Sequence, residues 1–369
     1  MLVLGQHSRD AVGFPPNLNS LFYWLFDGGL GVRFFFVISG FLITWLLIRE
    51  SDLTGRISLS YFYARRALRI LPVYAAFLLI LFTLQCYTPW MQSSAAWVSN
   101  LTFTTNFLSL DERSKASLPL WSLAVEEQFY LLWPGLLLGF GLAMNFRRAA
   151  FILVIPILLA PIFRVITNLV QGGVSSQSSG LSILVEWMME ESPSAAIFRS
   201  IFSTTSFLNY FDSLAIGALC AFLLARRGEK LIFYAEKIPK AICVIALLLI
   251  IVPHVLSHLQ IVKWLTGTVG PSMQAVGFAT LLVQSVLSPK FGIYRALNWR
   301  WVSQIGVLSY SIYIWNTIFY ATPDEFGFGQ VWWVSFPWWL IPSFAVAAFS
   351  YYALEKPLLR YRAQFRPAK

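Results

Sequence analysis

The sequence predicts an all-α, polytopic integral membrane protein, and three observations favour this fold class. Of the 369 residues, 57% are hydrophobic and only 12% are charged, whereas soluble domains usually carry about 25% charged residues. Trp, Tyr and Phe together form 17% of the chain, an aromatic content suited to membrane interfaces. Long apolar runs alternate with polar segments, and a membrane-spanning helix needs roughly 20 mostly apolar residues.

We expect about nine full spans, preceded by a partial one at the N-terminus, in a single membrane domain that covers residues 1–369. The apolar runs place the full spans at 29–49, 70–88, 119–142, 149–168, 204–225, 239–256, 263–287, 301–320 and 332–353. The segment Met1–His7 is too short to cross a bilayer and looks like the end of a span. Two longer outer loops are expected at 89–118 and 169–203.

The stretch Gly31–Tyr74 fixes the orientation of these spans. An uncharged apolar run, Phe34–Ile48, leads into a segment with five arginines: Arg49, Arg56, Arg65, Arg66 and Arg69. Basic residues near the ends of spans are retained in the cytoplasm. The first full span is therefore predicted to run inward, which makes the C-terminus cytoplasmic.

The net charge of +10 follows from the same arrangement. Twenty of the 27 Lys and Arg residues fall in the predicted inner segments, five fall in outer segments, and Arg33 and Arg164 lie inside spans. The positive-inside rule accounts for this distribution. A nucleic-acid partner is therefore not indicated.

Cysteine and histidine spacing gives no sign of a metal site. The three cysteines, Cys86, Cys220 and Cys243, lie in or at the ends of predicted spans without a CxxC pair, which favours buried structural thiols. His254 and His258 are four residues apart, but no Cys, Asp or Glu lies near them in the sequence. We interpret them as a pair at the membrane interface.

Charged groups at membrane depth are costly and usually face a cavity or a partner. In the segment Leu120–Tyr130, Ser122, Glu126 and Tyr130 repeat every four residues and share one face of a helix. Glu127 must then lie on another face. The alternative is that both acids lie at the outer end of a span, where they stabilise a helix N-terminus.

His7 is a second candidate for chemistry. Asp10 follows three residues later, close enough to orient an imidazole or raise its basicity. A buried neutral imidazole is a suitable general base near neutral pH. The alternative is a loop histidine at the membrane edge.

The cluster of Arg65, Arg66 and Arg69 could bind phosphates through its guanidinium groups. Arg65 and Arg69 have four-residue spacing, and Pro72 is expected to begin the next helix in its first turn. The alternative is that these arginines are retention charges that contact anionic lipid headgroups.

Two C-terminal segments place polar groups in or beside spans. Ser309–Asn316 carries hydroxyls and an amide within a span, and Ser350–Pro357 ends a span with Glu355 at the cytoplasmic face. Hydrogen bonds between helices would explain both.

Taken together, these motifs resemble the membrane-bound acyltransferase 3 family, which includes bacterial O-antigen and exopolysaccharide O-acetylases. The matching pieces occur in family order across nearly the whole chain. They are His7, Gly31–Ile43, Arg65–Arg66 with Arg69–Pro72, Trp121–Tyr130, Asn209–Ala218, and Ser350–Tyr351 with Glu355 and Pro357. At Asn316 the family often has histidine.

The resemblance implies about ten spans and acyl transfer from cytoplasmic acyl-CoA, expected to be acetyl-CoA, to a sugar hydroxyl. It implies no permanently bound cofactor and no metal. By residue-by-residue carry-over, His7 is the catalytic histidine, held by Asp10, and three arginines contact the donor: Arg65, Arg66 and Arg69. Glu126 is expected to be a further catalytic residue, and the other expected functional positions are Ser39, Ser122, Tyr130 and Glu355.

The expected function is therefore that of a bacterial inner-membrane O-acetyltransferase. Its partners would be acyl-CoA, membrane lipids, and a cell-surface glycan such as lipopolysaccharide or a lipid-linked sugar precursor. No SGNH-type hydrolase domain is expected after the membrane domain. Two alternatives stay open: a transporter or flippase for lipid-linked sugars that uses the same intramembrane charges, and a catalytically inactive relative of the acyltransferases.

Overall fold

A computed structural model describes residues 1–365 except 110–111, 172–199, 321–325 and 328–330. Within these residues every regular element is helical, and strand-like pairing is limited to one bridge between Val12 and Ser335. The predicted all-α class is confirmed. Most of the predicted outer loop at 169–203 lies outside the described residues.

Five segments in the described part are long and apolar enough to cross a membrane: Pro16–Thr54, Leu59–Tyr87, Phe146–Leu169, Phe207–Phe233 and Pro239–His258. They coincide with five of the predicted spans, as expected for a multi-pass membrane protein. The predicted total of nine full spans is not confirmed.

The remaining predicted spans are helical but less regular. Helix α6 (Leu120–Gly139) contains two adjacent acids, and the segment 263–287 is divided into α12 (Lys263–Thr268) and α13 (Gly270–Leu287). The last two are short, because α15 (Arg300–Trp315) has 16 residues and α17 (Leu340–Ser350) has 11.

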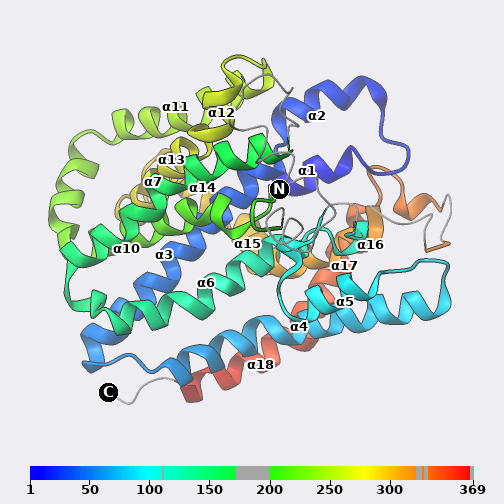
Figure 1. The fold of residues 1–369 in the computed structure, drawn as a ribbon, viewed down its shortest axis with the longest axis horizontal. Coiled ribbons are helices and arrows are strands. Elements are labelled where there is room, and N and C mark those ends of the chain that lie inside the picture. Colours follow the sequence, from blue (N-terminus) through cyan, green and yellow to red (C-terminus); the bar gives the residue numbers. More distant parts are fainter. Residues whose placement is uncertain (110–111, 172–199, 321–325, 328–330, 366–369) are drawn as a thin grey trace, which may run out of the picture.

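The centre of the molecule is the crossing of α3 (Gly28–Thr54) and α10 (Phe207–Lys237) (Figure 1). A Cβ atom on Gly40 would collide with the carbonyl group of Leu214, and one on Gly217 would collide with that of Val37. Small residues allow the backbones of membrane helices to approach closely in this way. These two glycines therefore determine how closely α3 and α10 pack.

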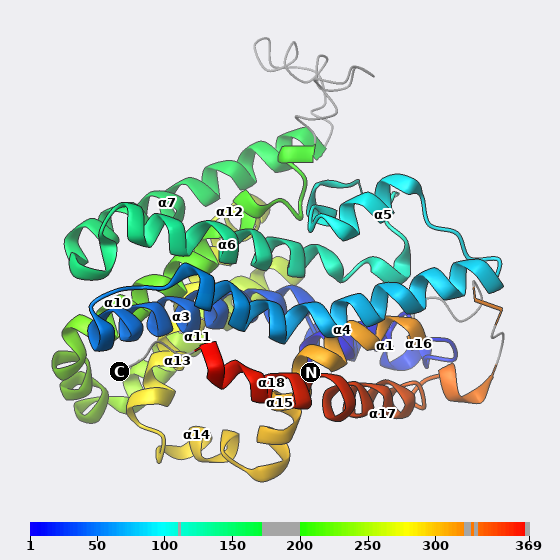
Figure 2. The ribbon, with the colours of Figure 1, turned by 90° about the horizontal axis from the view of Figure 1, so that it is seen from below.

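Other helices surround this crossing on two sides. Helices α7 (Phe146–Gln171) and α13 pack against α10, and α11 (Pro239–His258) packs against α13. On the other side lies α4 (Leu59–Tyr87), with α15, α17 and α18 (Lys356–Tyr361) beside it (Figure 2). Helix α6 contacts both α3 and α10, and α1 (Leu2–Ser8) packs on α3.

The basic segment after α3 is not the polar connection that we predicted. Helix α4 begins at Leu59, after Ser58 accepts a hydrogen bond from the backbone N–H of Tyr61 as an N-cap. The three clustered arginines therefore lie on a helix, and Pro72 is inside α4 instead of at its start. Apolar side chains such as Phe62, buried against the core, stabilise these early turns.

The connections gather at two opposite ends of the bundle. The end with α2 (Asn19–Leu25) and α5 (Ser94–Leu101), at the right of Figure 1, is called the loop end. The opposite end, with the turn after α3 and the link between α10 and α11, is called the turn end. By the distribution of basic residues the turn end is predicted to be cytoplasmic.

Candidate active site

His7 lies in α1 near the loop end and is held by a residue 309 positions away. Its Nδ1 is 2.9 Å from Oδ1 of Asn316, and its ring stacks on Tyr320 with the centroids 4.3 Å apart. The amide nitrogen of Asn316 donates to the carbonyl oxygens of Ile312 and Tyr313. Oδ1 of Asn316 is thus the acceptor, and Nδ1 of His7 carries the hydrogen. This leaves a lone pair on Nε2, as a general base requires.

In the structure, the imidazole of His7 is hydrogen-bonded to Asn316 and not to the predicted partner, Asp10. Helix α1 ends at Ser8, so Asp10 lies in the turn beyond it and its backbone N–H donates to the carbonyl oxygen of His7. Its carboxylate makes no hydrogen bond with His7 in the described part of the chain. Partial burial raises the pKa of the Asp10 carboxyl, and the neighbouring charge of Arg9 opposes this rise.

A cavity of about 460 Å³ lies between α1, α3, α6 and α15. Most of its lining is apolar, including Leu4 and Phe35. Its polar lining side chains come from α6, α15 and the residue after α15: Ser122, Ser309, Tyr310, Tyr313 and Asn316. The residue that orients His7 therefore borders a cavity of the size that small-molecule sites usually have.

The predicted polar face of α6 is present. The hydroxyl oxygens of Ser122 and Tyr313 are 2.5 Å apart, which links α6 to α15. One turn further along, the carboxylate of Glu126 accepts hydrogen bonds from Ser39 of α3 and from Tyr130. Glu126 is only 4% exposed, so this face joins three helices inside the bundle.

Glu127 differs from its neighbour Glu126. Its Oε1 is buried and has no hydrogen-bond partner among the described residues. The guanidinium group of Arg66 lies over the ring of Tyr130, 4.7 Å from its centroid, and its charge acts on both acids. A buried carboxylate with an unpartnered oxygen is costly for the fold alone.

The three predicted donor-binding arginines do not form one surface. Arg65 pairs with Glu50 at 2.7 Å and donates to the carbonyl oxygen of Phe365. Glu50 also accepts from the backbone N–H of Ser58. Arg65 therefore ties α3 and α4 to the C-terminal segment, which is a structural role.

Arg69 faces a different environment from Arg65 and Arg66. It is exposed and makes no hydrogen bond or ion pair in the part of the chain that the structure describes. Its charge acts on Glu355, which lies in the π-helical turn Tyr351–Glu355 and accepts a hydrogen bond from Ser311 of α15. Of the three arginines, Arg69 is the one with a guanidinium group open to a ligand.

These groups follow one another along α6 and α15, and together we call them the polar column. It runs through the bundle from the loop end toward the turn end, along α6 and α15. Ser311 and Tyr313 in α15 hydrogen-bond to Glu355 and Ser122. Asn316, which follows α15, hydrogen-bonds to His7. The members of the column are His7, Asn316, Tyr313, Ser122, Ser39, Glu126, Glu127, Tyr130, Arg66, Arg69, Ser311 and Glu355.

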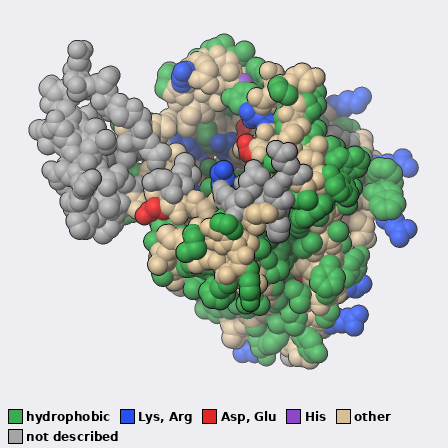
Figure 3. All heavy atoms as spheres, turned by 90° about the vertical axis from the view of Figure 1, so that its right-hand side faces the viewer, with side chains coloured by type: hydrophobic (Ala, Val, Ile, Leu, Met, Phe, Trp, Pro, Cys, Tyr) green, Lys and Arg blue, Asp and Glu red, His purple; other side chains and the backbone are tan. Residues whose placement is uncertain are grey.

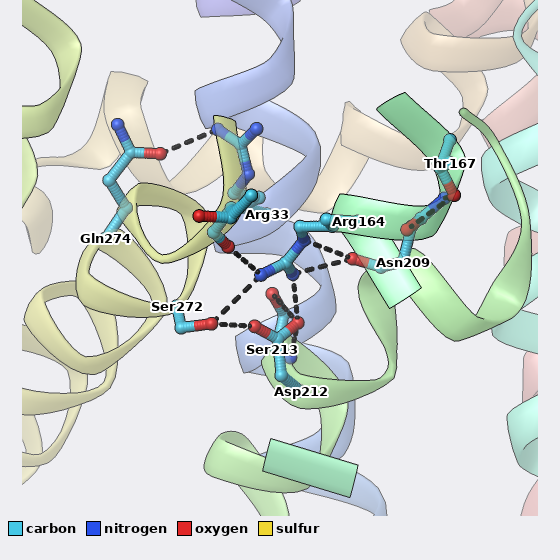
Figure 4. Close-up of polar contacts among 9 residues, drawn as sticks. Arg33, Arg164, Thr167, Asn209, Asp212, Ser213, Ser272 and Gln274 are labelled. Atoms are coloured by element: carbon cyan, nitrogen blue, oxygen red, sulfur yellow. Dashed lines mark hydrogen bonds and ion pairs between the residues drawn. The ribbon is translucent and has the colours of Figure 1, made fainter. Parts of the chain in front are cut away.

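A second buried cluster joins α7, α10 and α13 (Figure 4). Arg164 pairs with Asp212 at 2.7 Å and also donates to the carbonyl oxygens of Asn209 and Thr268 and to the hydroxyl of Ser272. Asp212 is fully buried and accepts from Ser272 as well. The sequence placed Arg164 inside a span, but its spacing gave no partner.

The family of the chain can now be stated from comparison. The model of the acyltransferase 3 family, described as an acyltransferase domain, matches residues 1–355. No solved structure matches the chain significantly.

Three bacterial proteins are examples of those similar to this chain. A Bacillus subtilis (strain 168) protein named "Putative peptidoglycan O-acetyltransferase YrhL" is 27% identical, over 91% of this chain and 51% of its own length. A Staphylococcus aureus (strain COL) protein named "Putative O-acetyltransferase SACOL0978" is 28% identical, over 79% and 46%. The Listeria monocytogenes (serovar 1/2a, strain EGD-e) protein "Peptidoglycan O-acetyltransferase OatA" is 35% identical, over 32% and 21%. The chain spans about half the length of the first two relatives. The resemblance inferred from the motifs is confirmed, and the chain belongs to the acyltransferase 3 family.

Proposed function

We propose that the chain is the membrane-embedded part of an O-acetyltransferase. It would move an acetyl group from acetyl-CoA to a hydroxyl of a cell-envelope glycan or of a lipid-linked sugar. The observation that carries this proposal is the hydrogen bond of His7 to Asn316, a residue that lines the cavity. It leaves the lone pair on Nε2 of His7 without a hydrogen-bond partner among the described residues. The names of the relatives favour a cell-wall glycan over the lipopolysaccharide expected from the sequence.

The proposed reaction is a direct acyl transfer. Nε2 of His7 takes the proton from the acceptor hydroxyl while the hydroxyl oxygen attacks the thioester carbonyl carbon. The C–S bond then breaks, and the imidazolium returns its proton to the departing thiolate of CoA. General-base help of this kind contributes about 100- to 10,000-fold to the rate.

The donor would approach from the turn end of the column. Arg69 is exposed and without an ion pair in the described residues, so it is free to contact a phosphate of CoA. The acyl arm would extend past Glu126 toward the cavity beside Asn316. This arrangement implies an inner-membrane protein with a cytoplasmic C-terminus, which the distribution of Lys and Arg supports.

The test uses the purified full chain in lipid nanodiscs with radiolabelled acetyl-CoA and a neutral peptidoglycan oligosaccharide. We expect label in the glycan and a mass increase of one acetyl group. Reconstituted vesicles carrying a lipid-linked sugar provide the comparison. Movement of that sugar without acetylation would support the transporter alternative, and neither activity would support an inactive family member.

A further inference from the structure

A second, smaller pocket lies near the loop end, away from the polar column. Its volume is about 140 Å³, and its polar lining comes mainly from α3, α7 and α10: Arg33, Arg164, Thr167, Asn168, Asn209 and Tyr210. Viewed from the loop end, the surface is hollowed, and Lys and Arg side chains lie in the hollow with Asp or Glu side chains beside them (Figure 3). Nothing in the proposed acyl transfer uses these groups.

Arg33 has unused hydrogen-bonding capacity at this pocket. Its Nη1 donates to Oε1 of Gln274 at 2.7 Å, and its guanidinium lies apart from the bonds around Arg164 (Figure 4). Its Nε is buried without a hydrogen-bond partner among the described residues. The nearby carboxylate of Asp27 is already engaged by the backbone N–H of Gly29 and by His254. Buried donors are nearly always satisfied in folded proteins.

The arginines around this pocket are also incompletely paired. Arg164 is neutralised by Asp212, but Arg33 has no ion pair in the described part of the chain. Arg113 is 6% exposed, and its Nη1 likewise has no partner among the described residues. Carboxylates act on both arginines from a distance, Asp27 on Arg33 and Glu112 on Arg113, but neither forms an ion pair with them among the described residues. Guanidinium N–H donors without a partner suit an oxyanion.

We propose that this pocket is a subsite for an oxyanion of the acceptor, with Arg33 as its main ligand. The inference rests on the proposed function and identifies the acceptor as an acidic one, bearing a carboxylate or a phosphate group. The volume is sufficient for one such group.

The position of the pocket allows one acceptor to reach both sites. Gln6, next to His7, accepts a hydrogen bond from the backbone N–H of Gly28 at 2.5 Å. Arg33 lies five residues further along α3, a rise of roughly 7.5 Å. An acidic group bound at Arg33 would therefore place the rest of the same molecule near the start of α3, where the helix of His7 packs.

The first arm of the test measures binding without catalysis. Thermal unfolding of the purified full chain is followed with inorganic phosphate or acetate, for the wild type, Arg33→Gln and Arg226→Gln. Arg226 is the matched control, because it pairs with Asp52 at the turn end. We expect either anion to raise the midpoint of the wild type and of the control but not of Arg33→Gln. Equal shifts in all three proteins would overturn the subsite.

The second arm uses three acceptors that share one oligosaccharide: neutral, with an added carboxylate, and with an added phosphate. For the acidic acceptor that the wild type prefers, Arg33→Gln should raise KM about tenfold or more and leave kcat unchanged. Arg33→Lys should recover part of the loss, which excludes misfolding as the cause. A preference for phosphate would indicate the lipid carrier, and one for carboxylate would indicate an acidic sugar.

An equal change in KM for the neutral acceptor would contradict the subsite. If the wild type acetylates none of the three acceptors, the proposed function fails. The binding arm then still decides whether Arg33 holds an oxyanion, so the two failures are distinguishable.

Discussion

This helix bundle contains two polar clusters, the polar column and the cluster around Arg164, and they differ in how completely their buried groups are satisfied. Around Arg164, five hydrogen bonds occupy the guanidinium group, and the carboxylate of Asp212 is paired and fully buried. Arginine has five N–H donors in total. In the polar column, by contrast, Glu126 meets only hydroxyl groups as hydrogen-bond donors among the described residues, and Glu127 has a buried oxygen without a partner there.

The difference indicates that the two clusters have different roles. A fully satisfied network rigidifies the core and fixes how α7, α10 and α13 pack. Groups that stay buried and incompletely bonded cost free energy without a return in stability. Such groups at membrane depth usually serve a function. We therefore assign structure to the Arg164 cluster and chemistry to the column.

The largest effect is expected at His7. Replacing it in His7→Gln removes the general base but keeps a polar side chain near Asn316. The rate of acetyl transfer should fall about 100- to 10,000-fold, with an unchanged thermal midpoint in detergent. Transfer at the wild-type rate would contradict the assignment of chemistry to the polar column.

The next largest effect concerns stability. Arg164→Gln leaves the carboxylate of Asp212 buried without its ion pair, which should lower the free energy of unfolding by about 3–5 kcal/mol. The matched variant Arg226→Gln removes an ion pair whose side chains are 29% and 36% exposed, and should cost about 0–1 kcal/mol. Unfolding in sodium dodecyl sulfate measures both. Similar losses for the two variants would argue against a structural role for the buried cluster.

A smaller effect is expected at Asn316, which positions His7. Asn316→Leu removes the hydrogen bond to His7 together with the two that the amide nitrogen donates to Ile312 and Tyr313. It should lower the transfer rate about tenfold. A purely structural residue would not change the tautomer of His7, so ¹⁵N NMR of the three histidines provides the specific readout. We expect Nδ1–H in the wild type and a mixture of tautomers in the variant. A wild type protonated on Nε2 would be inconsistent with the proposed base.

Local periodicity predicted the parts of the site that lie on one helix. Four-residue spacing placed Ser122, Glu126 and Tyr130 on one face, and the structure has them there. The start of α4 was missed, although Ser58 carries an N-cap signal, because basic residues were interpreted as a loop. Composition does not distinguish a basic loop from a basic helix end.

Partners that are distant in the sequence could not be predicted. The contact of His7 with Asn316 spans 309 positions, whereas the sequence offered Asp10 close by. Arg164 and Asp212 were each visible as charges inside spans, and a search for opposite charges at membrane depth would have paired them. Among Arg65, Arg66 and Arg69, the arginine that lacks an ion pair in the described residues is determined by acids on other helices. Sequence spacing does not show where those acids lie.

The most direct test compares the same chemical change in the two clusters, by measuring the acetyl transfer rate per folded molecule in Glu126→Gln and Asp212→Asn. Both substitutions turn a buried carboxylate into an amide of the same shape. We predict that Glu126→Gln folds with wild-type stability but loses most of its transfer rate, whereas Asp212→Asn loses stability and keeps the rate of the molecules that fold. The opposite pattern, or equal losses of rate in both variants, would contradict the assignment of chemistry to the column and structure to the Arg164 cluster.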